Sequence, residues 1–273
     1  MPQGCLTLLS DFGLSDSYVG MMKGTIAQIN PMLTVIDLTH QIPPQNIAAG
    51  RFCLMSAYPY FPKATVHVAV IDPGVGSTRR AIAVELATGF LVGPDNGLLS
   101  GVLSQTPAIA AVELTNPEYW RVANPSSTFH GRDIFAPVGA HLASGVPLTA
   151  LGTTISSQQL VSLTLPECQE VIAPATGTGV IHGAIQAIDH FGNLITNIPE
   201  SLLRGRLWSI AVGAIRISSQ PTYAAVPAGT LLALVGSHGW VEIAENQGNA
   251  QKRLQVEYAE KVEVFLESCI NSE

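Results

Sequence analysis

The first half of the chain alternates short apolar runs with segments that repeat apolar residues at helical spacing. Two segments, 18–29 and 47–58, place apolar residues three or four positions apart and predict amphipathic helices. Five apolar runs are typical of buried strands: 5–10, 33–38, 65–71, 81–86 and 90–92. Strands that alternate with helices predict an open, mostly parallel sheet covered by helices.

Beyond residue 163 the helical spacing largely disappears. Residues 164–178 are rich in Pro, Gly, Thr and Ala, which is typical of a boundary between domains. Four apolar runs separated by Gly, Ser and Asn then predict strands: 180–188, 207–217, 230–235 and 240–244. We therefore expect an α/β N-terminal domain over 1–163, a linker over 164–178 and a smaller, all-β, barrel-like C-terminal domain over 179–273.

Composition excludes several classes of protein. Hydrophobic residues make up 47% of the chain and charged residues only 12%, against roughly 25% in typical globular proteins, so we expect no extensive disorder. The net charge of −7 argues against a nucleic-acid partner, because phosphate binding needs a basic surface. No apolar run reaches roughly 18 residues and the N-terminus lacks signal-peptide features, so we expect a cytoplasmic protein without a membrane segment. Four dispersed cysteines and seven histidines without ligand spacing predict no metal site.

Three predicted strands run directly into an acidic residue and a glycine-containing turn. The acidic residues are Asp11, Asp72 and Asp95. In an open parallel sheet the carboxyl ends of the strands form one edge, where ligands bind. Each motif alone is ordinary turn chemistry, but three of them at strand ends predict a ligand site at that edge.

A second group of reactive side chains occupies residues 127–133, with the sequence Ser-Thr-Phe-His-Gly-Arg-Asp. Its Ser, His and Asp are adjacent in sequence, whereas hydrolytic triads are assembled from distant segments. No Gly-x-Ser-x-Gly motif is present. Two further polar motifs, at 189–193 and 236–240, are each consistent with a simple turn.

Taken together, six motifs resemble those of the S-adenosylmethionine (SAM) hydroxide adenosyltransferases, whose relatives include the SAM-dependent fluorinase and chlorinase. They occur in the family's order along nearly the whole chain: LLSDFGLSDSYVGMMKG (8–24), VIDPGVGSTRR (70–80), VGPDNGLLS (92–100), SSTFHGRDIFAPVGAHLA (126–143), AIDHFGNLITNI (187–198) and GSHGWVEIA (236–244). The resemblance implies a hydrolase that converts SAM and water into adenosine and L-methionine, without a cofactor. It also implies a homotrimer, with the substrate between the N-terminal domain of one subunit and the C-terminal domain of the next.

The resemblance also implies roles for individual residues. The hydrolytic group falls on Asp72, Arg79 and His130, with Arg80 as an alternative to Arg79. The substrate-binding residues fall on six further positions: Asp11 at the ribose hydroxyls, Asn96, Phe129, Asp189 at the methionine amino group, Asn193 at the adenine and Ser237 near the methionine carboxylate.

The chemistry of SAM is consistent with this set of residues. The sulfonium is already an excellent leaving group on ribose C5′, so the site needs only a well-aimed, desolvated water. Asp72 can orient that water, and either His130 or the Asp72–Arg79 pair can take its proton. The sequence leaves both possibilities open.

Two alternative functions rank below hydrolysis. A halogenase of the same family would bind a halide in place of water, and a nearby carboxylate disfavours an anion. The halogenating relatives carry another residue at the position of Asp72, and the fluorinase has a halide-binding serine at that of Gly131. A non-catalytic SAM- or adenosine-binding protein would gain nothing from Asp72, Arg79 and His130.

Overall fold

The computed structural model describes residues 4–172, 179–203 and 205–267. The chain divides between Leu163 and Thr164 into two compact units, which are described separately below. In the segment expected as a linker, Gln169–Ile172 form strand β8, which pairs with β9 (Gly179–Ile188) of the C-terminal unit. Residues 173–178 of that segment lie outside the described residues.

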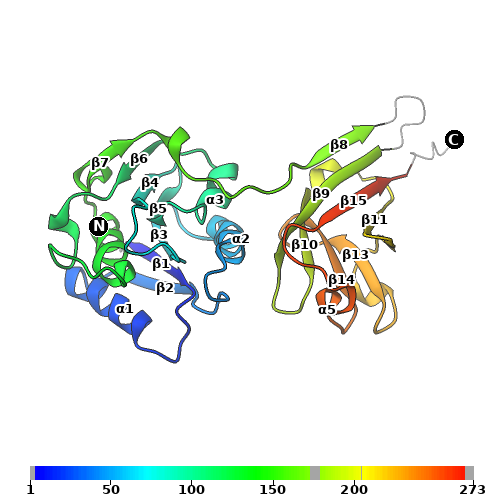
Figure 1. The fold of residues 1–273 in the computed structure, drawn as a ribbon, viewed down its shortest axis with the longest axis horizontal. Coiled ribbons are helices and arrows are strands. Elements are labelled where there is room, and N and C mark those ends of the chain that lie inside the picture. Colours follow the sequence, from blue (N-terminus) through cyan, green and yellow to red (C-terminus); the bar gives the residue numbers. More distant parts are fainter. Residues whose placement is uncertain (1–3, 173–178, 204, 268–273) are drawn as a thin grey trace. The chain divides into compact units, whose positions relative to one another are not determined.

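A seven-stranded sheet in the order β2-β1-β3-β5-β4-β6-β7 forms the centre of the N-terminal unit (Figure 1). Its strands are β1 (Cys5–Ser10), β2 (Thr34–Thr39), β3 (Thr65–Val70), β4 (Ala81–Glu85), β5 (Gly89–Pro94), β6 (Ala110–Glu113) and β7 (Thr153–Ile155). Strands β2, β1, β3 and β5 are parallel, whereas β5, β4, β6 and β7 pair antiparallel. The sheet is therefore mixed, and the expected parallel arrangement holds for only one half. The connection between β4 and β5 is too short for the crossover that a parallel pair requires.

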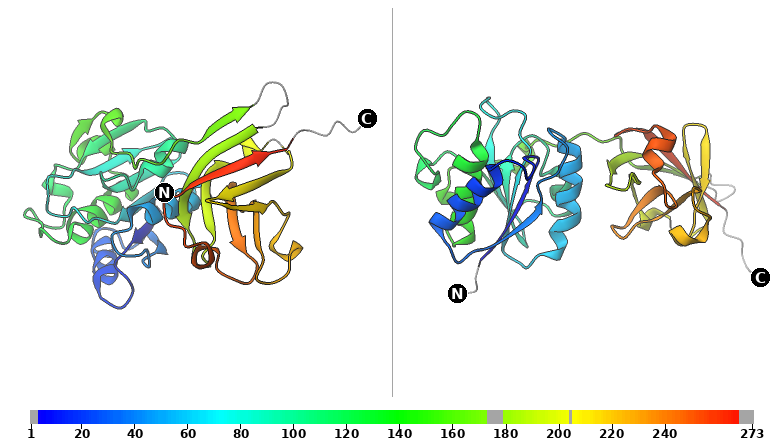
Figure 2. Two further views of the ribbon diagram at one scale, coloured as in Figure 1. Left: turned by 45° about the vertical axis from the view of Figure 1, so that its right-hand side comes forward. Right: turned by 90° about the horizontal axis from the view of Figure 1, so that it is seen from below.

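Helices cover both faces of this sheet (Figure 2). They are α1 (Tyr18–Ile29) and α4 (Ala136–Ala143) on one face, and α2 (Ile47–Ala57) and α3 (Ser100–Gln105) on the other. A Cβ atom at Gly139 of α4 would lie 2.5 Å from Val68 of β3, so the helix packs directly on the strand. The helical spacing predicted α1 and α2. It missed α4, which follows a π-helical turn over Gly131–Phe135.

The C-terminal unit is a nearly closed antiparallel barrel, in the order β12-β11-β15-β9-β10-β14-β13. Its remaining elements are β10 (Leu194–Pro199), β11 (Trp208–Val212), β12 (Ile215–Ser218), β13 (Leu231–Val235), β14 (Trp240–Glu245), α5 (Ala250–Leu254) and β15 (Lys261–Leu266). A bridge between Ser219 and Ala233 links the two ends of the sheet. The apolar run 207–217, predicted as one strand, is a hairpin instead, because Gly213 adopts a φ of 57° and reverses the chain.

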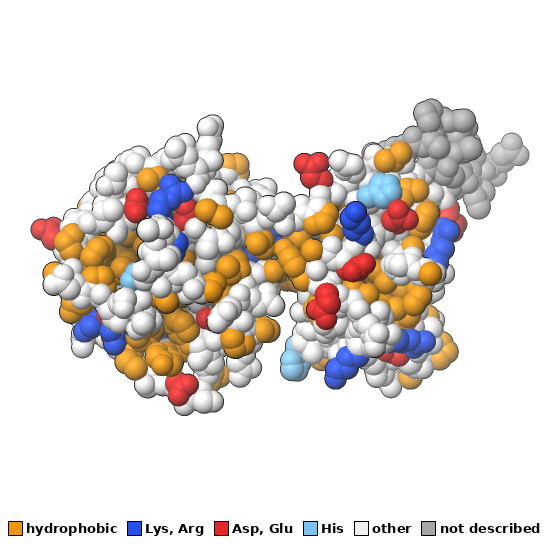
Figure 3. Space-filling view, viewed as in Figure 1, with side chains coloured by type: hydrophobic (Ala, Val, Ile, Leu, Met, Phe, Trp, Pro, Cys, Tyr) orange, Lys and Arg blue, Asp and Glu red, His pale blue; other side chains and the backbone are white. Residues whose placement is uncertain are grey.

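Charged side chains are sparse on the surface. On the face drawn in Figure 3, acidic and basic groups are interspersed among apolar and uncharged ones. Within the described ranges, no helix is long and apolar enough to cross a membrane.

Candidate active site

The carboxyl ends of β1, β3 and β5 form one edge of the sheet, because the three strands are parallel neighbours. Asp11, Asp72 and Asp95 follow these ends, as the sequence predicts. Asp11 and Asp72 line the same hollow of about 420 Å³. Asp95 does not line it, and its Oδ2 binds Arg80 Nη2 at 2.5 Å. Two of the three predicted carboxylates therefore belong to one candidate site.

Asp72, Arg79 and His130 form one connected group at this hollow. The Arg79 Nε donates to Asp72 Oδ1 at 2.9 Å, and its Nη2 donates to Asp72 Oδ2. The same Nη2 lies 2.7 Å from His130 Nδ1. The side chains of Asp72 and Arg79 are 5% and 11% exposed, so water screens this ion pair little. Since Arg80 pairs with Asp95, the geometry selects Arg79 as the member of the group.

Arg79 also determines the tautomer and the protonation state of the His130 ring. A guanidinium only donates hydrogen bonds, so His130 Nδ1 accepts one. Burial lowers the pKa of His130 and the charge of Arg79 lowers it further, against smaller opposite effects of Asp72 and Asp133. The ring is therefore neutral near pH 7, with its proton on Nε2. In this state His130 can donate from Nε2, while its lone pair on Nδ1 is engaged by Arg79.

A glycine allows the two loops that carry this group to approach each other. Gly76 has a φ of 77°, and a Cβ atom there would collide with the carbonyl oxygen of Ser127. Hydrogen bonds from Val75 N to Asp72 O and from Ser77 N to Gly74 O close the turn around it. The sequence Asp-Pro-Gly-Val-Gly thus brings Arg79 within reach of His130.

Asp133 holds the second loop in place. It is fully buried and accepts hydrogen bonds from Arg132 Nε at 2.7 Å, Arg121 Nε at 2.5 Å and Ser126 N at 2.9 Å. Burial would raise the pKa of Asp133, but these bonds together hold it well below its usual range. Asp133 therefore supports the loop and does not form a triad with His130.

Aromatic rings form the apolar wall of the hollow. Phe129 packs edge-on against Phe12 and Tyr18, with ring centroids 5.6 Å and 5.2 Å apart, and all three line the hollow. Tyr18 was expected only as a position of the helix pattern. A Cβ atom at Gly131 would lie 3.2 Å from the Phe12 ring, so this glycine allows the wall to pack closely.

Asn96 does not line the hollow. Its Nδ2 donates to the carbonyl of Ile71 at 2.8 Å, and its Oδ1 accepts from Leu98 N at 3.2 Å. The amide therefore anchors the backbone next to Asp72.

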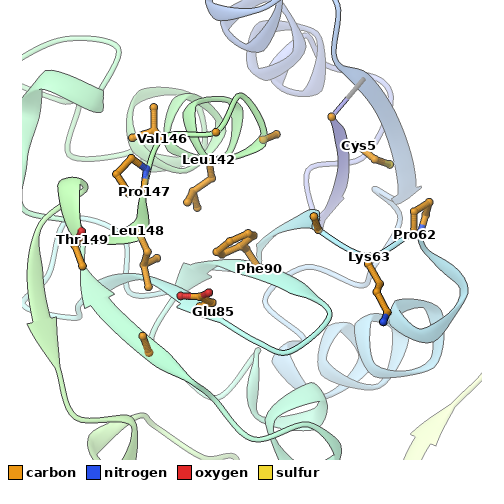
Figure 4. A pocket seen from close by; sticks show the side chains of 15 residues that line it. Cys5, Pro62, Lys63, Glu85, Phe90, Leu142, Val146, Pro147, Leu148 and Thr149 are labelled. Atoms are coloured by element: carbon orange, nitrogen blue, oxygen red, sulfur yellow. The ribbon is translucent and has the colours of Figure 1, made fainter. Parts of the chain in front are cut away.

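A larger hollow, of about 630 Å³, lies at the opposite edge of the sheet (Figure 4). It is lined mainly by apolar side chains such as Phe90, Leu142 and Val146, with Lys63 and Glu85 among them. It contains none of the residues predicted from the sequence, so the smaller hollow is the candidate active site.

In the C-terminal unit the structure brings Asp189 and Asn193 together in one turn. Asp189 Oδ1 accepts from Phe191 N and Asn193 N, and its Oδ2 accepts from Asn193 Nδ2, each at 2.9 Å. Ser237 is exposed in the turn between β13 and β14.

The sequence reasoning missed two residues of the C-terminal unit, Tyr223 and Glu242. Tyr223 donates to the buried Glu242 at 2.5 Å, and His238 Nε2 lies 3.2 Å from the same carboxylate. Burial, the hydrogen bond to Glu242 and the charges of Glu242 and Asp189 all raise the pKa of Tyr223. Tyr223 therefore lies within the electrostatic reach of Asp189, and no motif in the sequence indicates this.

Comparison with known proteins adds an independent line of support. The SAM hydroxide adenosyltransferase N-terminal domain matches residues 6–152, and the C-terminal domain of the same family matches residues 183–263. The chain belongs to this family. Every residue predicted for the site lies within one of the two matched ranges.

Individual relatives cover nearly the whole chain. An (R)-S-adenosyl-L-methionine hydrolase of Salinispora arenicola is 40% identical over 95% of this chain and 97% of its own. A fluorinase of an Actinoplanes species is 29% identical over 88% of this chain and 90% of its own. The crystal structure of an uncharacterized conserved protein from Thermotoga maritima superimposes with a TM-score of 0.85, at 34% identity, over 95% of this chain and 99% of that one.

Proposed function

We propose that this protein hydrolyses SAM to adenosine and L-methionine by attack of water on ribose C5′. The observation that carries the proposal is the Asp72–Arg79–His130 group, whose Asp72 and His130 line one hollow with Asp11. The name of the Salinispora relative, a hydrolase of the R epimer of SAM, supports the same reaction.

In the proposed reaction the water is held between Asp72 and His130. Asp72 accepts a hydrogen bond from the water, and His130 Nε2–H donates one to its oxygen, which leaves a lone pair directed at C5′. The C5′–O bond forms while the C5′–S bond breaks with its electron pair going to sulfur. Water's proton passes through Asp72 to solvent. The sulfonium is the leaving group, so the step uses no cofactor.

The sequence leaves two candidate bases open, and the hydrogen bond from Arg79 to His130 allows us to choose between them. Because Nδ1 of His130 already accepts from Arg79, the ring has no free lone pair for the water's proton. We therefore assign the role of base to Asp72 and that of donor to His130.

Substrate binding is assigned to the remaining residues. Asp11 accepts hydrogen bonds from the ribose hydroxyls, and Phe129 packs against the nucleoside. Asp189, Asn193 and Ser237 hold the amino-acid and adenine ends. A homotrimer that shares the substrate between subunits, and a cytoplasmic location, remain predictions.

Halogenation is disfavoured by two features of the hollow. The Asp72 carboxylate would repel a halide ion. A serine in place of Gly131 would bring its Cβ within 3.2 Å of the Phe12 ring, so the aromatic wall would have to shift.

The test is hydrolysis of each sulfonium epimer of SAM in heavy-oxygen water with a metal chelator present. We expect equimolar adenosine and methionine, with the label in the adenosine 5′-hydroxyl. Asp72→Ala and His130→Ala should lose turnover but still bind adenosine. Unlabelled adenosine, or 5′-chloroadenosine as the only product when chloride is added, would contradict the proposal.

A further inference from the structure

A chain of polar side chains leads from the surface to a buried pair beside the turn that carries Asp11. Ser10 Oγ lies 2.7 Å from His40 Nδ1, and His40 Nε2 lies 3.1 Å from Asp37 Oδ1. Lys23 Nζ binds the other oxygen of Asp37 at 2.6 Å. Ser10 and His40 are 0% and 2% exposed, whereas Asp37 and Lys23 reach the surface.

The register of the sheet places Ser10 beside His40. Strands β1 and β2 are in register up to Leu8 opposite Asp37, and then shift by one residue so that Leu9 lies opposite Thr39. Such an irregularity redirects the side chains that follow it and is common beside active sites. Without it, the residue opposite Ser10 would be one position earlier in β2.

The hydrogen bonds at Ser10 have one consistent direction. Ser10 Oγ accepts from Phe12 N at 3.3 Å, so its own proton can point to His40 Nδ1. At the other end of the ring, His40 Nε2 lies 3.1 Å from Asp37 Oδ1, without the geometry of a hydrogen bond. Burial raises the pKa of Asp37, but the interactions with Lys23 and His40 more than offset this, so that the pKa lies below its usual range.

The same two segments meet at two further points. Gly13 N donates to the carbonyl of His40 at 2.7 Å, and Gln45 N donates to Asp11 Oδ2 at 2.7 Å. The turn that presents Asp11 and Phe12 to the hollow is therefore held by two hydrogen bonds. One joins Gly13 to the carbonyl of His40, and the other joins Gln45 to the Asp11 carboxylate. Loss of one of these contacts would allow the Asp11 carboxylate to move.

We propose that Ser10 and His40 are positioning residues for substrate binding, because their buried hydrogen bond fixes the turn that carries Asp11 and Phe12. The inference rests on the proposed function only in that Asp11 binds the ribose. Neither side chain reaches the hollow, so they do not act on the reacting atoms. Their effect is on the affinity for the nucleoside and not on the chemical step.

The experiment compares variants of the full-length protein by calorimetric binding of adenosine and by steady-state hydrolysis of SAM. Ser10→Ala and His40→Ala should raise the Kd for adenosine and the KM for SAM by about three- to tenfold, since each loses one positioning hydrogen bond. The kcat should stay within about twofold. His40→Asn keeps an acceptor near the position of Nδ1 and should restore most of the affinity.

The chain offers a matched control on the same strand. Thr7 Oγ1 lies 2.8 Å from His67 Nδ1, and both residues are as buried as Ser10 and His40, but neither contacts the turn of Asp11. Thr7→Val should lower the melting temperature without changing Kd or KM.

The outcomes separate the inference from the proposed function. If wild-type protein binds adenosine and Ser10→Ala binds it equally well, the positioning role is wrong while the hydrolase stands. An equal loss of affinity in Thr7→Val, or a fall in kcat at unchanged KM, would also overturn the inference. If the wild-type protein neither binds adenosine nor cleaves SAM, both proposals fail.

Discussion

Replacement of Arg79 by methionine should separate the structural and catalytic roles of the Asp72–Arg79–His130 group. Methionine keeps much of the side-chain volume, but it removes the three hydrogen bonds to Asp72 and the bond to His130 Nδ1. The Asp72 side chain is only 5% exposed, so its carboxylate would lose its counter-ion while most of it stays shielded from bulk water.

The size of the effect follows from this burial. Removal of one partner of a buried ion pair costs about 3–5 kcal/mol, because the other charge is left uncompensated. The pair lies at the wall of a hollow, so we expect a loss of about 3 kcal/mol in the free energy of unfolding at neutral pH. We also expect kcat to fall by about a hundredfold or more, since the carboxylate is no longer held toward the water. The pKa of His130 should rise, because the positive charge that lowers it is gone.

A double variant makes this reasoning refutable. Asp72→Asn in the Arg79→Met background removes the uncompensated charge, so stability should recover by about 1–2 kcal/mol, while hydrolysis should not recover because the proposed base is gone. Urea denaturation, chromatography of released adenosine and NMR titration of His130 measure the three effects. If the double variant is no more stable than Arg79→Met, the buried carboxylate is not the cause of the loss.

The neighbouring arginine provides the control. Arg80 pairs with Asp95, whose side chain is 3% exposed, but neither residue lines the hollow or contacts His130. Arg80→Met should therefore lose stability in a similar way and keep kcat and KM close to those of the wild-type protein. A loss of turnover equal to that of Arg79→Met would mean that the two arginines are not functionally distinct.

Three further expectations concern single positions. Gly76→Ala should destabilise the protein by about 1–3 kcal/mol in urea denaturation and reduce kcat, because φ at this position is positive and the new Cβ would collide with Ser127. A variant as stable as the wild-type protein would contradict this. Asp11→Ala should raise the calorimetric Kd for adenosine by about tenfold or more, and an unchanged Kd would remove Asp11 from the ribose site. Burial lowers the pKa of His67 from 6.5 to about 4. The unfolded chain then takes up a proton first as the pH falls below 6.5, so stability should drop by about 3 kcal/mol between pH 6.5 and 4, and this drop should be absent in His67→Gln.

The edge that carries the site was predictable because its signal is local. An apolar run followed by Asp and a glycine turn identifies the end of a buried strand, and β1, β3 and β5 are in fact parallel neighbours. This local pattern does not tell which carboxylates face the hollow, and only the family resemblance pointed to Asp11 and Asp72. Arg79 and Arg80 are adjacent, and successive residues of an extended chain point to opposite sides. The course of the loop alone decides that Arg79 meets Asp72 and Arg80 meets Asp95.

Residues that act through backbone atoms or buried bonds leave no pattern in the sequence. Gln45 binds Asp11 through its N–H, which every residue except proline offers. His40 follows β2, whose sequence carries no motif that indicates a function. Its contact with Ser10 depends on a one-residue shift between β1 and β2. The link between Tyr223 and Glu242 likewise joins distant segments of the barrel.

The charges in the hollow explain why one of its two carboxylates needs a cation and the other does not. Among the residues that the structure describes, Asp11 accepts from a backbone N–H only, which suits neutral ribose hydroxyls, while Asp72 is held by a guanidinium. With His130 neutral, the Asp72–Arg79–His130 group carries no net charge, so Asp11 gives these four side chains one net negative charge, opposite to the single positive charge of the sulfonium. Hydrolysis removes that positive charge, because adenosine is neutral and the thioether of methionine is uncharged. The attraction that draws SAM into the hollow is therefore lost in the products, which favours their release without any further device.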